Sequence, residues 1–388
     1  MRIVVAPDKF KGTLDAVEVA EAMMRGARAV HPEASFVLRP MADGGEGTVS
    51  ALLAARGGRT TTHTVTDPLG SKVHAEVGVM EDGTACVEMA AASGLQLVST
   101  SHRDPLAARS DGTGELVAAA AERVPERIIV GIGGSATVDG GTGAARAFGW
   151  RFLDDSGDEL PPGGGALVDL ARIDASSVRT IEAEVVGACD VDSPLLGPVG
   201  AARRFARQKG ADQDAVERLE AGLACLAERI REDVGVDVAS IPGAGAGGGM
   251  GAGLVAFFGG ELRSGFDLIA RSSELAGAIE SADLVITGEG RLDAQSLRGK
   301  VPIGVANLAR AAKTKCFAVV GDLELERGEW RAAGFELAVG LLQSGGHDAV
   351  QRDPAGAIES ATTGLLRHQR DTRAGRRVRE RRRPRILF

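Results

Sequence analysis

Short apolar runs alternate with amphipathic stretches near both ends of the chain. Residues 3–6 form an apolar run that stops at Pro7, and apolar residues then recur at helical spacing through residues 19–30. A second strand is predicted at residues 35–38, followed by a helix from about residue 48. The later part of the chain repeats this rhythm, with a strand and turn at 282–290, a helix at 301–312 and strands at 315–322 and 335–342. This alternation is typical of a parallel sheet with crossover helices.

The rhythm changes at about residue 60. Short strand patterns joined by Pro-Leu-Gly and Asp-Gly turns lead to a predicted helix at 113–123, a strand at 127–131 and a long glycine-dense stretch. We therefore expect an α/β fold with two domains. A discontinuous Rossmann-like domain would contain residues 1–62 and 270–366, and a second, glycine-rich α/β domain would be inserted at 63–269. No fixed-period repeat is visible, which argues against a solenoid.

The composition argues against several classes of protein, among them disulfide-rich, zinc-binding and membrane-spanning proteins. The 388 residues include 54 glycines, no tyrosine and only four cysteines, which lie far apart. The cysteine spacing favours neither a zinc site nor a disulfide framework, and no apolar run is long enough to span a bilayer. The N-terminus lacks the pattern of a signal peptide. We expect a cytoplasmic enzyme with no membrane partner, and the sequence does not indicate its oligomeric state.

The last 22 residues are strongly basic. Residues 367–388 hold ten arginines against Asp371 and Glu380, although the whole chain has a formal net charge of −8. This segment has no apolar period and no interleaved aromatic residues, so a disordered extension is the favoured interpretation. The acidic remainder of the chain opposes nucleic-acid binding.

Six glycine-rich loops follow predicted strands or open predicted helices. They are PDKFKGT, MADGGEGT, GIGGSATVDGGTG, CDVDS, PGAGAGGGMGAG and TGEGRLD. Glycine permits positive φ, so that consecutive backbone N–H groups can converge on an anion, and a following helix adds its N-terminal dipole. Phosphate together with a cation held by carboxylates is the simplest ligand that suits such loops. Any single loop could equally be a turn.

Carboxylates within these loops are candidates for metal binding or proton transfer. They are Asp8, Asp43, Glu46, Asp139, Asp190, Asp192, Glu289 and Asp293. Lys11 and Lys300 are the lysines nearest such loops, and each could equally be an exposed helix-start residue. Ser135 lies outside any Gly-x-Ser-x-Gly elbow, so its hydroxyl is interpreted as a phosphate contact and not as a nucleophile.

Glycine-rich loops can also form the Walker A or the dinucleotide-binding fingerprint. The Walker A pattern is absent, because Lys300 is followed by Val301. A dinucleotide fingerprint occurs twice by letter: at glycines 243, 245 and 248, which follow no strand, and at Gly131, Gly133 and Ala136, with Asp154 where a ribose-binding acid would lie. The second loop continues before any helix begins, so an NAD-dependent hydroxy-acid dehydrogenase remains only as an alternative.

The order of these loops resembles the glycerate kinase family of bacterial sugar-acid catabolism. The matching segments include VVAPDKFKGTL, MADGGEGTV, EMAAASGL, GIGGSATVDGG, ACDVDSPLLGP, QKGA, PGAGAGGGMGAGL and LVITGEGRLDAQSLRGKVPIGVA, and together they span residues 3 to about 322. Lys9, Asp111 and the basic tail depart from the family pattern. The resemblance implies ATP-dependent phosphorylation of a glycerate hydroxyl, in a cleft between two α/β domains. It favours 2-phosphoglycerate over 3-phosphoglycerate as the product. A kinase for another small sugar acid is the alternative within this class.

Residue roles follow as hypotheses. Backbone N–H groups of Gly133, Gly134, Ser135, Gly245, Gly247, Gly248 and Gly249 would bind the phosphates of ATP. Asp190 and Glu289 would hold Mg²⁺ or activate the substrate hydroxyl, with Asp293 and Asp8 as second choices. Lys11, Arg291 and Lys300 are the cations available for the carboxylate of glycerate, and Asp43, Gly44 and Gly45 complete the expected substrate site.

Overall fold

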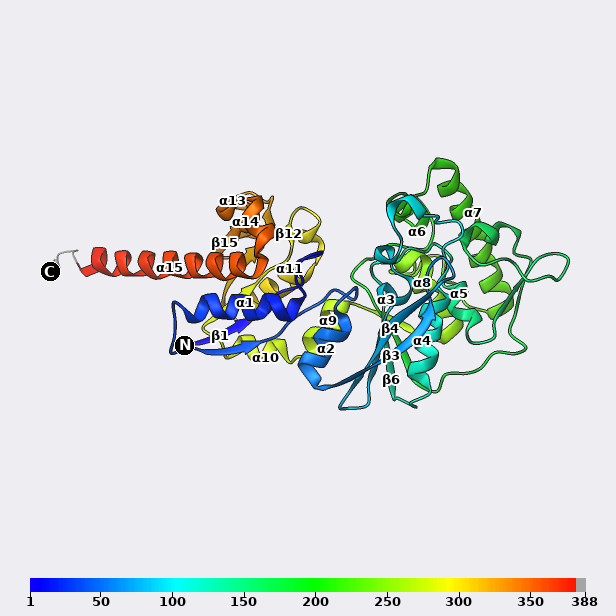
Figure 1. Ribbon diagram of the computed structural model, residues 1–388, viewed down its shortest axis with the longest axis horizontal. Helices are drawn as coiled ribbons and strands as arrows, with labels where there is room; N and C mark the ends of the chain where they lie inside the picture. The colour runs from blue at the N-terminus through cyan, green and yellow to red at the C-terminus, as the bar shows by residue number, and fades with distance from the viewer. Residues whose placement is uncertain (382–388) are drawn as a thin grey trace, which may run out of the picture. The chain divides into compact units, whose positions relative to one another are not determined.

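The computed structural model describes residues 1–381, which form two compact units. One unit combines residues 1–41 with residues from 273 onward, and the other contains Ala42–Ser272 (Figure 1). Both units contain parallel sheets with helices, so the predicted α/β class is confirmed. None of the helices in residues 1–381 is long and apolar enough to cross a membrane.

The first unit is built on a five-stranded parallel sheet. Its strands, in spatial order, are β15 (Leu337–Gly340), β13 (Lys315–Val320), β11 (Leu284–Thr287), β1 (Arg2–Val5) and β2 (Ser35–Leu38). The chain places β2 on one side of β1 and the later strands on the other side. The winding direction therefore reverses between β1 and β11, and doubly wound sheets bind ligands at the carboxyl ends of the strands at such a point.

Helices cover this sheet and bury its apolar side chains. They are α1 (Ala16–Arg28), α10 (Leu275–Glu280), α11 (Val301–Ala311), α12 (Arg327–Ala332), α13 (Leu341–Gly345), α14 (His347–Arg352) and α15 (Pro354–Arg381). Helix α1 begins with a capping box in which Asp15 and Glu18 accept each other's backbone N–H. Met23 of α1 and Ile358 of α15 lie in the same core as Phe317 of the sheet.

Helix α15 packs along α1 and extends beyond the predicted end of the domain (Figure 1). The two helices approach so closely at Gly26 that a Cβ there would lie 2.3 Å from the carbonyl oxygen of Glu359. Gln369 is still buried, so the expectation of disorder from residue 367 is not met over the part that the structure describes. The helix continues through Arg381. The rest of the predicted tail, residues 382–388, lies outside the described residues.

The second unit contains a mixed six-stranded sheet. Its order is β10 (Glu261–Arg263), β9 (Glu184–Ala188), β6 (Arg127–Gly131), β5 (Ala85–Glu88), β4 (Lys72–Met80) and β3 (Gly58–Thr66). Strands β3, β4 and β5 pair antiparallel, whereas β5, β6, β9 and β10 pair parallel. The carboxyl ends of the four parallel strands therefore lie at one edge of the sheet.

The helices of the second unit connect and cover these strands. They are α2 (Thr48–Arg56), α3 (Met89–Ser93), α4 (Asp111–Ala121), α5 (Thr142–Arg146), α6 (Ala201–Phe205), α7 (Gln213–Arg229), α8 (Ala246–Phe258) and α9 (Gly265–Ser272). Two small sheets complete the structure, the antiparallel pair β7 (Arg151–Leu153) with β8 (Arg172–Asp174) and the parallel pair β12 (Arg291–Leu292) with β14 (Asp322–Leu323).

The boundary between the units lies earlier than the sequence pattern places it. The expected division after residue 62 falls inside β3, whereas the structure divides after Met41. Helix α2 belongs to the second unit because it packs on that unit's sheet. The backbone N–H of Val49 donates to Glu88 Oε1 at 2.8 Å, and a Cβ on Gly78 would meet Val49 Cγ1 at 2.7 Å. The second boundary lies at Ser272, close to the expected residue 269.

The glycine run that opens α8 packs directly against the loop that follows β6. Gly248 has φ of +72°, and a Cβ there would lie 1.9 Å from the carbonyl oxygen of Thr137. Its own carbonyl accepts from the N–H of Gly140 at 3.1 Å. Two backbones therefore meet at a position where no side chain fits.

Replacement of Gly248 by alanine is expected to destabilise the protein strongly. Strain at positive φ costs on the order of 1–3 kcal/mol, and the overlap with Thr137 adds to it, so we expect a total loss above about 3 kcal/mol. Gly259 is the matched control, because its φ is +61° and a Cβ there meets nothing within 4 Å. Gly259→Ala should therefore show the strain alone. Urea unfolding of both variants tests this, and equal losses would contradict the packing argument.

Candidate functional site

Two buried carboxylates lie where the winding of the first sheet reverses. Asp8 follows β1 and Glu289 follows β11, and these residues are 7% and 5% exposed. The N–H of Asp8 donates to the carbonyl oxygen of Gly288 at 2.8 Å, and Thr287 Oγ1 donates to the carbonyl oxygen of Ala6 at 2.7 Å. The two loops are thus joined by hydrogen bonds, and their acids belong to the carboxyl ends of neighbouring strands.

Lys300 lies beside this pair. Its Nζ is 3.8 Å from Glu289 Oε2, and its side chain is partly exposed. Lys11 is exposed, and a Cβ on Gly290 would lie 3.3 Å from its backbone nitrogen, so the loop after β11 also contacts the loop after β1 at this point. We call Asp8, Lys11, Glu289 and Lys300 the switch-point cluster.

The two other predicted residues of this loop have local partners. Asp293 Oδ1 accepts from the N–H groups of Gln295 and Ser296 at 2.8 and 3.0 Å, so it caps the turn that follows. Burial raises the pKa of its carboxyl, but these hydrogen bonds and the charge of Lys300 outweigh burial and leave the pKa below its usual value. Arg291 is largely exposed and pairs with Asp322 and Glu324.

A second cluster lies at the carboxyl ends of the parallel strands of the other unit. The loop Gly133–Ser135 follows β6, and the N–H of Gly133 donates to the carbonyl oxygen of Gly44 at 3.1 Å. A Cβ on Gly44 would lie 2.4 Å from the carbonyl oxygen of Ala188, at the end of β9. The loops after β6 and β9 and the loop before α2 therefore converge, and we call Asp43–Gly45, Gly133–Ser135 and Asp190 the glycine-loop cluster.

Asp190 is the partly buried acid of this cluster. Burial raises the pKa of its carboxyl to about 6, the charge of Asp43 adds to this increase, and hydrogen bonds from Ser264 and Phe266 oppose it. The N–H of Phe266, in the first turn of α9, donates to Asp190 Oδ2 at 3.1 Å. Asp190 thus combines the anchoring of a helix with a carboxyl that titrates close to neutral pH, which is typical of functional sites.

Asp43, the other acid of this cluster, forms a local turn. Its Oδ1 accepts from the N–H of Gly45 at 3.2 Å. Gly44 and Gly45 are buried by the convergence of the loops. Among the remaining acids predicted in these loops, Glu46 is exposed, and the Asp192 side chain is 94% exposed and lies 3.9 Å from Arg204.

The loop after β6 presents backbone donors. Among the residues that the structure describes, none accepts a hydrogen bond from the N–H of Gly134 or of Ser135. Gly134 is exposed and has φ of +76°. Behind the loop, Lys209 Nζ donates to Ser135 Oγ at 2.7 Å. Lys209 was not predicted as a site residue, because its 74-residue separation from Ser135 leaves no local pattern.

Most of the glycines at the start of α8 are buried against other segments and are not accessible to a ligand. Gly245, Gly248 and Gly249 are buried, and a Cβ on Gly245 would lie 2.2 Å from the carbonyl oxygen of Pro194. Gly247 is partly exposed and adjoins the loop after β6, because a Cβ there would lie 2.9 Å from the carbonyl oxygen of Ile132. Close packing is therefore a sufficient reason for glycine at the three buried positions.

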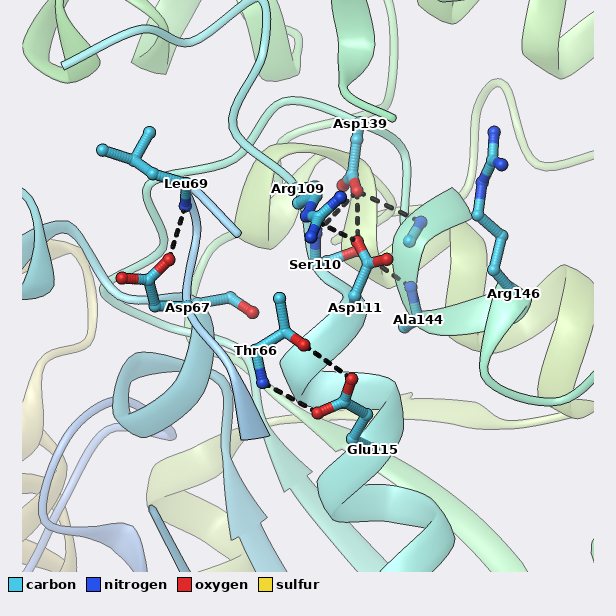
Figure 2. A network of polar contacts seen from close by, with 12 residues as sticks. Thr66, Asp67, Leu69, Arg109, Ser110, Asp111, Glu115, Asp139, Ala144 and Arg146 are labelled. Atoms are coloured by element: carbon cyan, nitrogen blue, oxygen red, sulfur yellow. Dashed lines mark hydrogen bonds and ion pairs between the residues drawn. The ribbon is translucent and has the colours of Figure 1, made fainter. Parts of the chain in front are cut away.

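Asp139 forms the centre of a buried network that joins α4 to α5 (Figure 2). Its Oδ2 accepts from Ser110 Oγ at 2.7 Å and from the N–H of Gly143 at 3.2 Å. In the same network, burial raises the pKa of the Asp111 carboxyl, although Arg109 lies 3.7 Å away. Asp139 was among the predicted site acids, and its hydrogen bonds give it a structural role.

The dinucleotide fingerprint has a different structural context here. Helix α5 begins at Thr142, well beyond the end of β6 at Gly131, so no helix N-terminus follows the first glycines directly. Asp154 follows β7, which pairs with β8 in a separate sheet, and it accepts from the N–H groups of Ser156 and Asp158. A Rossmann ribose site is not formed by these residues.

Each cluster contains carboxylates, whose oxygens are suitable ligands for Mg²⁺. Among the side chains that the structure describes, no three of His, Cys, Asp or Glu gather as a metal site. Mg²⁺ commonly retains water and binds one or two carboxylates together with substrate phosphates. Considered within its own unit, Asp190 offers one partly buried carboxylate, and Glu289 offers one buried carboxylate in the other unit.

Comparison with known proteins agrees with the loop pattern. The sequence profile of the glycerate kinase family matches residues 3–368. The chain is 47% identical over 347 residues to the glycerate 2-kinase of Escherichia coli K12, which covers 89% of this chain and 91% of that protein. It is 46% identical to the glycerate kinase of Bacillus subtilis 168, over 83% of this chain and 85% of the relative.

A solved structure shares the fold. The crystal structure of a protein assigned as glycerate kinase 2 from Salmonella typhimurium LT2 matches with a TM-score of 0.83 and 40% sequence identity, covering 96% of this chain and 99% of that chain. The chain therefore belongs to the glycerate kinase family of phosphotransferases.

Proposed function

We propose that this protein is an ATP-dependent kinase that phosphorylates glycerate and forms 2-phosphoglycerate. The observation that carries the proposal is the placement of acid-bearing loops at the carboxyl ends of parallel strands, in a chain that matches the family over residues 3–368. The name of the Escherichia coli relative, glycerate 2-kinase, supports the choice of product.

The glycine-loop cluster is suited to phosphate. The N–H groups of Gly134 and Ser135 have no acceptor among the described residues, and an anionic oxygen would supply one. Gly133 positions this loop through its bond to Gly44, and Gly247 adjoins it. We assign the phosphates of ATP to this loop, since phosphoryl transfer depends mainly on positioning and charge neutralisation.

The carboxylates are assigned to the metal and to the reacting hydroxyl. Bound Mg²⁺ would neutralise phosphate charge, and Asp190 in the second unit and Glu289 in the first are each a candidate carboxylate for it. In the switch-point cluster, Asp8 and Glu289 are buried acids that could accept a proton from a glycerate hydroxyl. Lys300, close to Glu289, and Lys11 supply positive charge for the glycerate carboxylate.

The first test is a direct assay of the product. Purified protein is incubated with Mg-ATP and a panel of hydroxy acids, ADP release is measured, and phosphorus NMR identifies the phosphorylated position. We expect turnover with D-glycerate and a 2-phosphate product. Turnover with another acid alone would indicate a kinase with a different acceptor, and ATP binding without ADP release would contradict the proposal.

Asp190→Asn and Glu289→Gln test the carboxylates. Loss of a carboxylate that holds the metal or accepts the proton should lower kcat by a factor on the order of a hundred or more. Asp155→Asn and Glu280→Gln are matched controls, because both acids are exposed and lie outside the clusters. If both site variants fold and keep near-normal kcat, the assignment is wrong.

Lys300→Met tests the substrate cation. Loss of a charged hydrogen-bond donor should raise the KM for glycerate by about tenfold or more, and the KM for ATP should change little. Lys315→Met is the control, because Lys315 pairs with Glu336 away from the cluster. A larger effect on the KM for ATP would assign Lys300 to the nucleotide.

A further inference from the structure

A buried lysine lies behind the loop that follows β6. Lys209 is 3% exposed, and its Nζ donates to Ser135 Oγ and to the carbonyl oxygen of Thr137, each at 2.7 Å. No carboxylate among the side chains that the structure describes forms an ion pair with it. A buried ammonium group without a paired carboxylate is unfavourable, so its retention calls for a reason beyond packing.

The hydrogen bond from Lys209 constrains the Ser135 hydroxyl. When Ser135 Oγ accepts from Nζ, its own proton must be donated in another direction. None of the described residues accepts a hydrogen bond from that hydroxyl. The backbone N–H groups of Gly134 and Ser135 likewise have no acceptor among the described residues. Ser135 is itself only 6% exposed. Three donors without an acceptor therefore lie on two consecutive residues, next to a buried positive charge.

We propose that the Ser135 hydroxyl and the N–H groups of Gly134 and Ser135 bind an anionic oxygen, and that Lys209 is the positioning residue that orients this hydroxyl. In line with the assignment above, the anionic oxygen belongs to a phosphate of the nucleotide, and the carboxylate of the acid substrate is the alternative that the test distinguishes. This inference rests on the proposed kinase function and adds Lys209 to its machinery. Lys209 acts through Ser135, so it is not itself expected to touch the ligand.

The electrostatic surroundings of Lys209 agree with this role. Burial lowers the pKa of its ammonium group to about 7, and the charge of Asp139 partly opposes the decrease. Arg103 and Asp104 line the same interior space. An anion bound at Ser135 would favour the charged form of the lysine, so that ligand binding and protonation would support each other.

Ser135→Ala and Lys209→Met test the proposal through steady-state kinetics. Both variants should raise the KM for the same ligand by about tenfold to a hundredfold, because each removes the oriented hydroxyl. An effect on ATP identifies a phosphate, and an effect on D-glycerate identifies a carboxylate. The double variant should be little worse than either single variant. Lys315→Met is the control with no expected effect. Unchanged KM values for both ligands in both variants would overturn the proposal.

Stability measurements separate positioning from a structural role. Lys209→Met removes a buried charge and replaces the lysine with an apolar side chain of similar shape. The Tm of this variant at pH 7 should therefore equal or exceed that of the wild type. The pKa of Lys209 is lower in the folded protein than in the unfolded chain, so the wild type should gain stability as pH rises from about 7 to 10. Lys209→Met should lack this gain. A lower Tm in Lys209→Met, with unchanged ligand binding in Ser135→Ala, would leave Lys209 a structural residue only.

Direct binding distinguishes failure of this inference from failure of the kinase assignment. Calorimetric titrations with ATP alone and with D-glycerate alone need no turnover. A wild type that binds one of them more tightly than Ser135→Ala supports the anion site even if glycerate is not phosphorylated. A wild type that phosphorylates glycerate, with Ser135→Ala binding both ligands equally well, retains the proposed function and refutes the anion site.

Discussion

Close approach of one backbone to another, at positions that leave no room for a Cβ, determines the geometry of the glycine-loop cluster. Gly44 meets Ala188, Gly133 meets Gly45, and Gly248 meets Thr137. Three loops from distant parts of the sequence can therefore lie within hydrogen-bond distance of one another at the edge of the sheet. The unusual glycine content of the chain is in part the consequence of this packing.

The same packing pairs several backbone donors of the loop after β6. Ile132, Gly133, Ala136 and Gly140 all donate to carbonyl groups of neighbouring segments. The N–H groups of Gly134 and Ser135 have no acceptor among the described residues, and the proposed function would supply one. A loop that is held by backbone hydrogen bonds can bind an anion with little reorganisation, and such preorganisation favours phosphoryl transfer.

Local pattern was sufficient to predict the strands and helices near both chain ends, because their apolar periodicity reflects burial in a parallel sheet. The predicted acids Asp8 and Glu289 lie together for the same reason, since both follow neighbouring strands. The sequence pattern was insufficient to predict features that depend on contacts between distant segments of the chain. Helix α2 joins the second unit through packing on β4 and Glu88, and Lys209 reaches Ser135 from a distant segment. Asp139 resembles a site acid in sequence, and only its buried partners reveal its role.

The topology of the first unit also constrains how the chain folds on the ribosome. Strand β1 pairs with β2 soon after both emerge, but its other neighbour, β11, is synthesised only after the whole segment Ala42–Ser272. The side of β1 that will pair with β11 therefore has no hydrogen-bond partner until β11 is synthesised. All strands of the intervening unit are synthesised before that point. The edge of β1 beside the future switch-point cluster therefore gains its strand partner only late in translation.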